Sequence, residues 1–347
     1  MHRENRKPKD RDFLRTREGM FFCVTGYLHP PDRYTAYLKY SPTSEGKWED
    51  EATAYRRELP YYHVRNVART VDYLEAYYPA YVSHCRVRDF RFSMVPRHRV
   101  ARYYLPEGRL SEILDSPQDQ LEEEVRGLAL QMAAEAAVEP AVLGITGSVL
   151  IGLHNPAFSD IDLTIYGLDN GRRLRKALSE SRIPSIRQLD DRFMAKWSRG
   201  IAERFPLTVE EARYFASRRW NYGTYRGRYF SIHPIRSDEE IKEVYGDHVY
   251  RGCGTGRIRA TVADAGEALF MPAIYRIEDV RLLEGDPAAT GVRELVSYEG
   301  LYRDIVDAGS LVEAKGKVEA VDGKPRRLVI GSLALGGQGY VKPVQGI

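Results

Sequence analysis

The stretch GITGSVLIGLHNPAFSDIDLTIYG, residues 144–167, places a Gly-Ser pair after one apolar run and two aspartates inside the next. Aspartate is a poor strand former, and it costs free energy when it is buried without a partner. Asp160 and Asp162 nevertheless alternate with the apolar residues of their run. Their position in a predicted strand therefore needs a chemical reason.

The two aspartates share one face of the strand predicted for residues 160–167. Side chains of a strand alternate between its faces, so Asp160 and Asp162 project from the same face about 7 Å apart. Two carboxylates on one edge can bind one or two hard divalent cations, and Mg²⁺ prefers such oxygens together with substrate phosphates. We therefore expect Asp160 and Asp162 to bind Mg²⁺ or Mn²⁺.

Gly147 and Ser148 lie where a predicted strand, residues 141–146, gives way to a short helix. Glycine permits close approach of the backbone, and free helix N–H groups with a serine hydroxyl can hold a phosphate. Eleven residues separate Ser148 from Asp160, which is enough for a short helix and a turn. A triphosphate with its metal fits this spacing. His154, in the intervening loop, is expected to touch phosphates, with an ordinary turn as the alternative.

Helical and strand patterns around this stretch predict an α+β fold with a mixed sheet. Ser116 and Pro117 predict the start of a helix. Changes of pattern divide the chain into four parts: a disordered basic leader (1–11), an N-terminal α+β module (12–110), a core (111–245) and a C-terminal β-rich barrel or sandwich (246–347).

The composition narrows the class of protein. A net charge of +3 over 347 residues lacks the bias of a dedicated nucleic-acid binder. Three scattered cysteines argue against a disulfide framework or a zinc site. The sequence has neither an apolar run long enough to span a membrane nor the apolar segment of a secretory signal. We therefore expect a cytoplasmic protein without a membrane partner.

The Gly-Ser pair, its spacer and the residues DIDL resemble the signature of the polymerase-β-like nucleotidyltransferase superfamily, over residues 143–166. The resemblance implies that the core is a nucleotidyltransferase core. It also implies that Gly147 and Ser148 hold a nucleoside triphosphate, and that Asp160 and Asp162 bind Mg²⁺ for transfer of a nucleoside monophosphate to a hydroxyl. The whole chain, including YLHPPDRYTAYLKY, is similar to an archaeal group of predicted nucleotidyltransferases.

The pattern of that superfamily includes a third carboxylate on a later strand. The best-placed strand here, RYFSIHPIR, offers Ser231 and His233 instead. His233 is expected to be a base or a metal ligand, with a purely structural histidine as the alternative. Asp190 and Asp191 are further candidates for the third acid, with a surface charge pair as the alternative.

Two other interpretations of the whole chain are open, the first of which is motivated by the missing third acid. One is a nucleotide- or RNA-binding protein on a catalytically degenerate core, and the other is an interaction scaffold. The segment from Arg213 to Tyr229 interleaves arginines with aromatic residues. Arginines attract phosphates and aromatic rings stack on bases, so this segment is the candidate RNA contact. A solvated helix face with aromatic residues in the core is the alternative.

Overall fold

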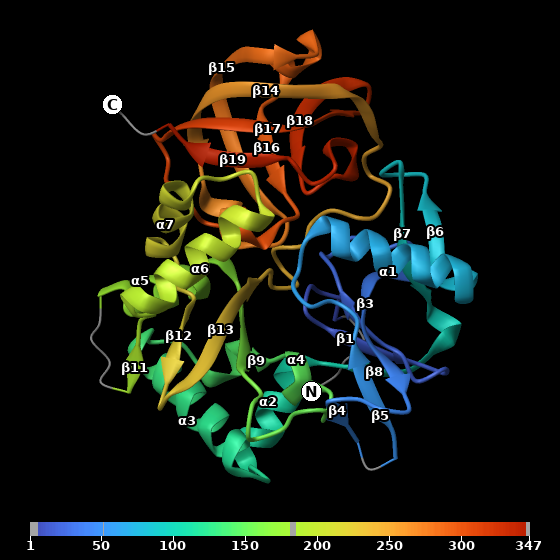
Figure 1. Ribbon diagram of the computed structural model, residues 1–347, viewed down its shortest axis with the longest axis vertical. Helices are drawn as coiled ribbons and strands as arrows, with labels where there is room; N and C mark the ends of the chain where they lie inside the picture. Colours follow the sequence, from blue (N-terminus) through green and yellow to red (C-terminus); the bar gives the residue numbers. More distant parts are fainter. Residues whose placement is uncertain (1–5, 51, 181–184, 345–347) are drawn as a thin grey trace. The chain divides into compact units, whose positions relative to one another are not determined.

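The computed structural model describes residues 6–50, 52–180 and 185–344, and the chain forms two compact units (Figure 1). The first unit comprises the described residues of Met1–Leu59, Met94–Asp190 and Arg219–Lys242. The second comprises those of Pro60–Ser93, Asp191–Arg218 and Glu243–Ile347. Both units combine helices with strands, which confirms the α+β class. Because the chain passes between the units several times, neither unit is one continuous segment.

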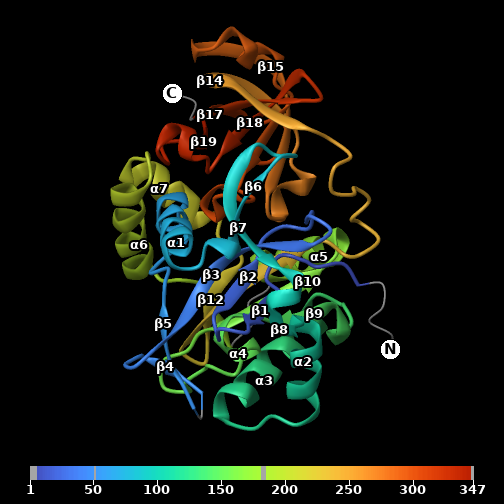
Figure 2. The same ribbon diagram turned by 90° about the vertical axis from the view of Figure 1, so that its right-hand side faces the viewer.

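An antiparallel sheet of the first unit is built from the N-terminal residues (Figure 2). Its strand order is β4-β5-β3-β2-β1-β8, and residues Met94 to Pro96 of β7 (Phe90–Pro96) pair with β3. Fully buried apolar side chains such as Leu14, Phe22 and Leu38 hold it together. The strands are β1 (Phe13–Thr16), β2 (Phe21–Val24), β3 (Arg33–Thr43), β4 (Trp48–Glu49), β5 (Ala54–Arg57) and β8 (Val100–Tyr104).

The described part of the predicted leader is packed against the first unit. The Arg6 guanidinium lies 2.7 Å from the Asp12 carboxylate, and Lys9 Nζ lies 2.7 Å from Asp238 Oδ1. Both Asp12 and Lys9 are buried. Ion pairs therefore hold these residues in place, and residues 1–5 lie outside the described chain.

A mixed sheet of the first unit carries the candidate site. Its order is β11-β12-β13-β10-β9, with β10 and β13 parallel and the other neighbours antiparallel. The strands are β9 (Leu143–Ile145), β10 (Ile161–Tyr166), β11 (Ile186–Arg187), β12 (Tyr222–Tyr225) and β13 (Arg228–Ile235). The strands predicted on either side of the Gly-Ser pair are thus present, but β9 has only three of the six predicted residues and β10 six of the eight.

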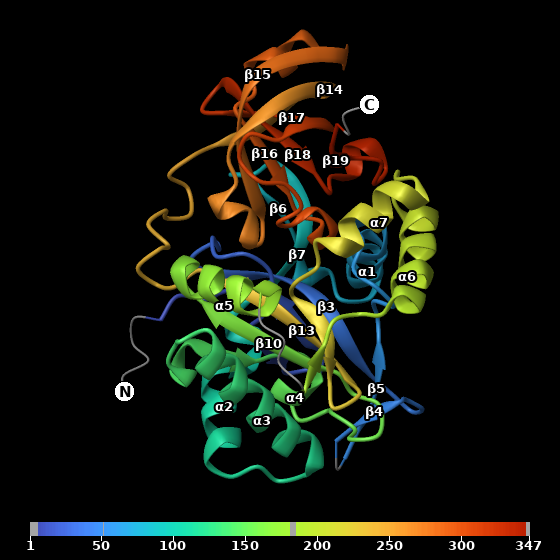
Figure 3. The same cartoon turned by 90° about the vertical axis from the view of Figure 1, so that its left-hand side faces the viewer.

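Four helices belong to the described part of this unit (Figure 3): α2 (Pro106–Asp115), α3 (Gln120–Glu135), α4 (Gly147–Leu150) and α5 (Leu168–Glu180). α2 contacts β9 and α3, whereas α5 contacts β10 and β13. The predicted helix start was wrong, because α3 begins after Asp119, whose side chain accepts from the Glu122 N–H. Leu128 of α3, Leu163 of β10 and Leu174 of α5 belong to one buried core.

The second unit contains a six-stranded sheet ordered β14-β15-β16-β18-β17-β19. β14 also pairs with β17, so β14, β15, β16, β18 and β17 form a closed ring of paired strands, and Ala212 and Phe215 of α7 belong to its core. No described helix has the length and apolar character needed to cross a membrane. The elements are α1 (Val64–Tyr77), β6 (Val82–Cys85), α6 (Asp191–Arg204), α7 (Val209–Ser217), β14 (Tyr250–Asp264), β15 (Ala273–Gly285), β16 (Glu294–Ser297), β17 (Leu311–Val321), β18 (Lys324–Ile330) and β19 (Tyr340–Pro343).

Candidate functional site

The two aspartates lie at the beginning of β10, beside β13. Asp162 is in register with Ser231, and both neighbours of Asp162 along β10 are fully buried. The Asp162 side chain is 37% exposed, and Asp160, just before the strand, is exposed. The pleat of the strand thus sends its apolar side chains into the core and leaves both carboxylates accessible.

The turn from β9 to α4 lies directly against the acidic strand. The Thr146 N–H donates to the Asp162 carbonyl over 2.8 Å, and Gly147 adopts a φ of +69°. A Cβ added to Gly147 would lie 2.6 Å from Asp162 Oδ2. Both the left-handed conformation and the close carboxylate therefore require glycine here. The structure brings together the two halves of the motif that the sequence separates.

Ser148 lies beside the loop that leads into β10. Its Oγ is 3.4 Å from Ser159 Oγ, and that oxygen in turn accepts from the Asn155 N–H over 2.9 Å. The loop therefore holds Ser159, and with it the backbone entering Asp160, close to the start of α4. Ser148, Gly147 and the two aspartates share one small region of the first unit.

The pKa values of the two carboxylates are shifted in opposite directions. Partial loss of hydration and the negative charge of Asp162 raise the pKa of Asp160 to about 6. Burial also acts to raise the pKa of Asp162, but the electrostatic interaction with His233 and the hydrogen bond from Ser231 outweigh it. The pKa of Asp162 consequently stays far below its usual range. A divalent cation between the two groups would relieve their repulsion.

Ser231 connects His233 to Asp162. Ser231 Oγ donates to Asp162 Oδ1, and His233 Nε2 lies 2.9 Å from the same Oγ and 3.9 Å from Asp162 Oδ1. A hydroxyl has one proton, and here it points to Asp162, so the imidazole must donate its Nε2–H to the serine oxygen. His233 is 6% exposed. This geometry suits a residue that orients Ser231 and, through it, Asp162.

His154 and the two alternative acids are placed differently. His154 Nε2 lies 2.8 Å from Asp119 Oδ2, the cap of α3, so a carboxylate of the protein already engages this ring. Asp190 and Asp191 are exposed, and Asp191 is the first residue of α6 in the second unit. Neither of these two acids lies on β10 or β13.

The basic-aromatic segment 213–229 is shared between the units, with Arg218 in the second and Arg219 in the first. Arg218 forms an ion pair with Asp307, also in the second unit. Arg228 forms an ion pair with Glu124 and donates to the Ser159 carbonyl over 2.7 Å. These two arginines therefore have structural partners within their own units.

An aromatic pair from the same segment lies near the acids. The rings of Tyr222 and Tyr229 stack with centroids 6.0 Å apart and planes inclined by 25°. Tyr229 lies two residues before Ser231 on β13, so the two side chains share a face of the sheet. Burial, Tyr222 and the two aspartates raise the pKa of Tyr229. The pair therefore belongs to the surroundings of the candidate site.

Three cationic side chains of the N-terminal part of the first unit also belong to the site, and the sequence did not reveal them. Arg57 acts to lower the pKa of Asp160, and Lys39 acts to lower that of Asp162. Burial, Arg57 and Arg11 in turn lower the pKa of Lys39 to about 8. No sequence motif marks these residues, because they lie more than 100 positions before the acids. Lys39 and Arg57 belong to the N-terminal sheet, and Arg11 precedes its first strand.

Asp160 and Asp162 can supply only part of the coordination shell of a hard divalent cation. Within residues 6–50, 52–180 and 185–344, no group of three or more His, Cys, Asp and Glu side chains is arranged to hold a metal. Asp160 and Asp162 offer carboxylate oxygens, which suit Mg²⁺ or Mn²⁺. Since Mg²⁺ usually keeps waters and binds substrate phosphates as well, two carboxylates are a sufficient protein contribution.

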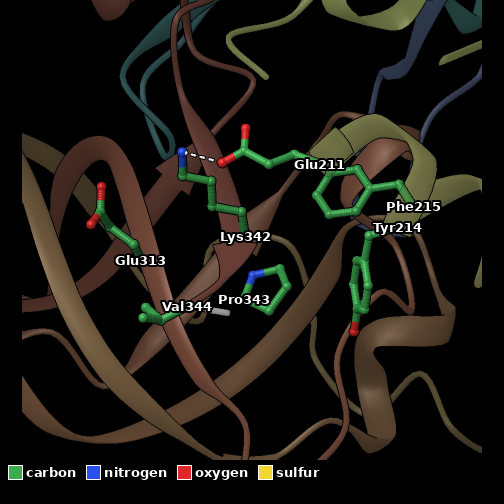
Figure 4. Close-up of a pocket in the computed structure, with 7 residues that line it drawn as sticks. All are labelled: Glu211, Tyr214, Phe215, Glu313, Lys342, Pro343 and Val344. Atoms are coloured by element: carbon green, nitrogen blue, oxygen red, sulfur yellow. Dashed lines mark hydrogen bonds and ion pairs between the residues drawn. The ribbon is translucent and has the colours of Figure 1, made fainter. Parts of the chain in front are cut away.

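A small pocket in the second unit is lined by Tyr214 and Phe215 of the segment 213–229, but by none of the residues expected to bind the metal or the triphosphate (Figure 4). It lies among α7, β17 and β19, with a volume of about 200 Å³. Lys342 Nζ pairs with Glu211 Oε1 over 2.7 Å, and Glu313 accepts from the Tyr340 hydroxyl over 2.8 Å. Its charged side chains thus satisfy one another or their neighbours.

Comparison with known proteins adds one relationship over nearly the full length of the chain. No family model and no solved structure matches it. An uncharacterized protein of Methanocaldococcus jannaschii is 29% identical over 348 residues, which cover 97% of this chain and 99% of the relative. The chain is therefore similar, nearly end to end, to a protein whose name states no activity.

Proposed function

We propose that this protein is a nucleotidyltransferase that moves a nucleoside monophosphate from a nucleoside triphosphate to a hydroxyl acceptor in the presence of Mg²⁺ or Mn²⁺. The contact between Gly147 and the Asp162 carboxylate carries this proposal. It supports a site in which a backbone that phosphates can approach closely adjoins a pair of metal-binding acids. The resemblance of the same residues to the polymerase-β-like superfamily points in the same direction.

Each group has a distinct task in the proposed reaction. Asp160 and Asp162 hold the metal, which when bound offsets the negative charge of the phosphates. Gly147 and Ser148 contact the triphosphate, and Ser231 keeps Asp162 oriented. The acceptor oxygen forms a bond to the α-phosphorus, the bond to the bridging oxygen breaks, pyrophosphate leaves and the hydroxyl proton is released. Alignment and electrostatic stabilisation supply most of the rate.

A second candidate function is nucleotide binding without turnover. It is favoured by one observation, namely that Ser231 and His233 occupy the face of β13 next to Asp162, where an acid would complete the site. A core with two acids could retain affinity for a nucleotide and its metal while failing to align an acceptor.

Pyrophosphate release distinguishes the two functions. The protein is incubated with each of the four nucleoside triphosphates, Mg²⁺ or Mn²⁺, and total cellular RNA or protein. The proposal predicts pyrophosphate release that requires the metal and an acceptor pool. Saturable calorimetric binding without pyrophosphate would identify the binding protein instead. Absence of both binding and release would contradict both candidates and favour a scaffold.

A further inference from the structure

The N-terminal sheet of the first unit lies against the candidate site. Thr146, the residue before Gly147, donates its hydroxyl proton to the Arg11 carbonyl over 2.8 Å. Near Asp160, the centroid of the Phe158 ring lies 4.1 Å from Lys47 Nζ and 6.3 Å from the centroid of the Trp48 ring. Two separate contacts thus fix this sheet beside both halves of the motif.

Three cationic side chains from this part of the unit gather next to the aspartates. Lys39 of β3 is half-buried and lies within electrostatic range of Arg11, Arg57 and Asp162. Arg11 interacts with Asp162 as well, and Arg57, at the end of β5, interacts with Asp160. The strands themselves are coupled, because the Glu58 N–H donates to the Lys39 carbonyl over 2.9 Å. Positive and negative groups therefore border the same space.

Like charges so close together lower the stability of the free protein unless an anion compensates them. Asp160 and Asp162 compensate the cations only while they bind no metal. Suppose that a divalent cation neutralises the two acids. Among the described ion pairs of the three cations, the remaining carboxylate is then Asp10, whose Oδ2 lies 3.5 Å from Arg11 Nε. A triphosphate brings about four negative charges, and metal and cations can share them.

We propose that Arg11, Lys39 and Arg57 form the receptor for the polyphosphate of the nucleotide, facing the Asp160–Asp162 pair. This inference rests on the proposed function and assigns it three binding residues outside the Gly-Ser motif. Guanidinium groups bind phosphate oxygens through two hydrogen bonds, and a lysine serves as a point charge. Asp160 and Asp162 would hold the metal, whose charge would help to offset that of the same phosphates.

Calorimetry with inorganic tripolyphosphate and Mg²⁺ tests the receptor without any acceptor or base. Removing a charged hydrogen-bond partner should weaken affinity about tenfold to hundredfold in Lys39→Met and in Arg57→Gln. Lys39→Arg should retain most of the affinity. Arg56→Gln is the matched control, because Arg56 adjoins Arg57 on β5 but forms an ion pair with Glu58 at 3.0 Å. Its affinity should equal that of the wild type.

The outcomes separate this inference from the proposed function. If Lys39→Met and Arg57→Gln, shown to be folded by circular dichroism, bind tripolyphosphate like the wild type, the receptor is overturned whether or not the protein releases pyrophosphate. Failure of the wild type to bind tripolyphosphate overturns it equally. Binding that depends on Lys39 and Arg57, without pyrophosphate release from any nucleotide, upholds the receptor and contradicts the enzyme. Since Arg57 is exposed, its variant keeps the test valid if a change at Lys39 disturbs folding.

Discussion

The Asp162 carboxylate lies so close to Gly147 that a Cβ on this glycine would stand 2.6 Å from Asp162 Oδ2. Real Cβ atoms do not approach an oxygen so closely, so either the turn or the carboxylate would have to move. The relationship joins a proposed phosphate contact to a proposed metal ligand. It also provides a steric test of the site that does not depend on the acceptor.

Gly147→Ala should therefore cost both stability and nucleotide binding. Its left-handed backbone alone should cost roughly 1–2 kcal/mol of unfolding free energy, and displacement of Asp162 should further weaken metal-dependent nucleotide binding. Gly152→Ala is the matched control, because Gly152 has a φ of +71° and no heavy atom within 4 Å of an added Cβ. Denaturation should show a lower free energy of unfolding in both variants. Calorimetry should show weaker nucleotide binding only in Gly147→Ala. Equal binding by the two variants would place the phosphate contact elsewhere.

Asp160→Asn and Asp162→Asn should each abolish nucleotide transfer while the fold persists. A metal-binding carboxylate contributes several kcal/mol to transition-state stabilisation, and an amide is a much poorer ligand for Mg²⁺. Relief of the repulsion between the two acids should keep Asp160→Asn at least as stable as the wild type near neutral pH. Thermal denaturation and pyrophosphate release measure the two effects. Asp169→Asn, at an exposed position on α5, should leave both unchanged, and near-normal turnover of both site variants would refute the assignment.

Ser231→Ala should lower turnover by loosening Asp162. Loss of a hydrogen bond to a charged group costs about 1.5–3 kcal/mol, or roughly tenfold to hundredfold in rate if the bond matters fully in the transition state. His233→Ala should have a smaller effect of the same kind, and His233→Gln, whose amide can donate to Ser231, should restore part of it. Steady-state kinetics should place these losses in kcat rather than KM. A loss in His233→Ala that glutamine does not restore at all would favour histidine as a base or a metal ligand.

Local pattern predicted the elements of the site well. The alternation around Asp160 and Asp162 and the small residues before α4 identified β10 and the turn, since both signals depend on neighbouring residues. The sequence could not show that Ser231 would stand between His233 and Asp162, because this depends on the register of two parallel strands. Register is a property of the assembled sheet.

Long-range contacts account for the rest of what sequence reasoning did not find. Lys39 and Arg57 lie in an aromatic-rich segment that the sequence predicts to be a separate N-terminal module, yet they border acids more than 100 residues later. His154 was expected to touch phosphates, and the structure shows its ring held by Asp119, which caps α3. Neither contact leaves a local signal, because each is created when separate elements pack.

A buried carboxylate in the second unit should make stability depend on pH. Glu299 is 3% exposed, and its Oε1 accepts the Val64 N–H over 2.8 Å at the start of α1. Burial outweighs this hydrogen bond and raises the pKa of Glu299 from 4.5 to about 7. The folded state therefore binds this proton more tightly than the unfolded state. Its contribution to stability is present below about pH 4.5 and is lost as the pH rises to about 7.

Glu299→Gln should remove that pH dependence, because its amide oxygen can still accept the Val64 N–H without carrying a charge. The displacement of the pKa corresponds to roughly 3 kcal/mol of unfolding free energy, an upper bound for this group. Chemical denaturation at a series of pH values should show the variant gaining on the wild type as the pH rises. A constant difference between the two proteins would mean that folding does not shift the pKa of Glu299.

The central claim is that Asp160 and Asp162 serve transfer of a nucleoside monophosphate, and the position of a radiolabel tests it most directly. The wild type and both asparagine variants are incubated with Mg²⁺, cellular RNA or protein, and a nucleoside triphosphate labelled on either the α- or the γ-phosphate. We predict that the wild type transfers only the α-label to a macromolecule, with release of labelled pyrophosphate from the γ-labelled substrate, and that neither variant does so. Transfer of the γ-label, or transfer of the α-label by both variants at the wild-type rate, would contradict the account.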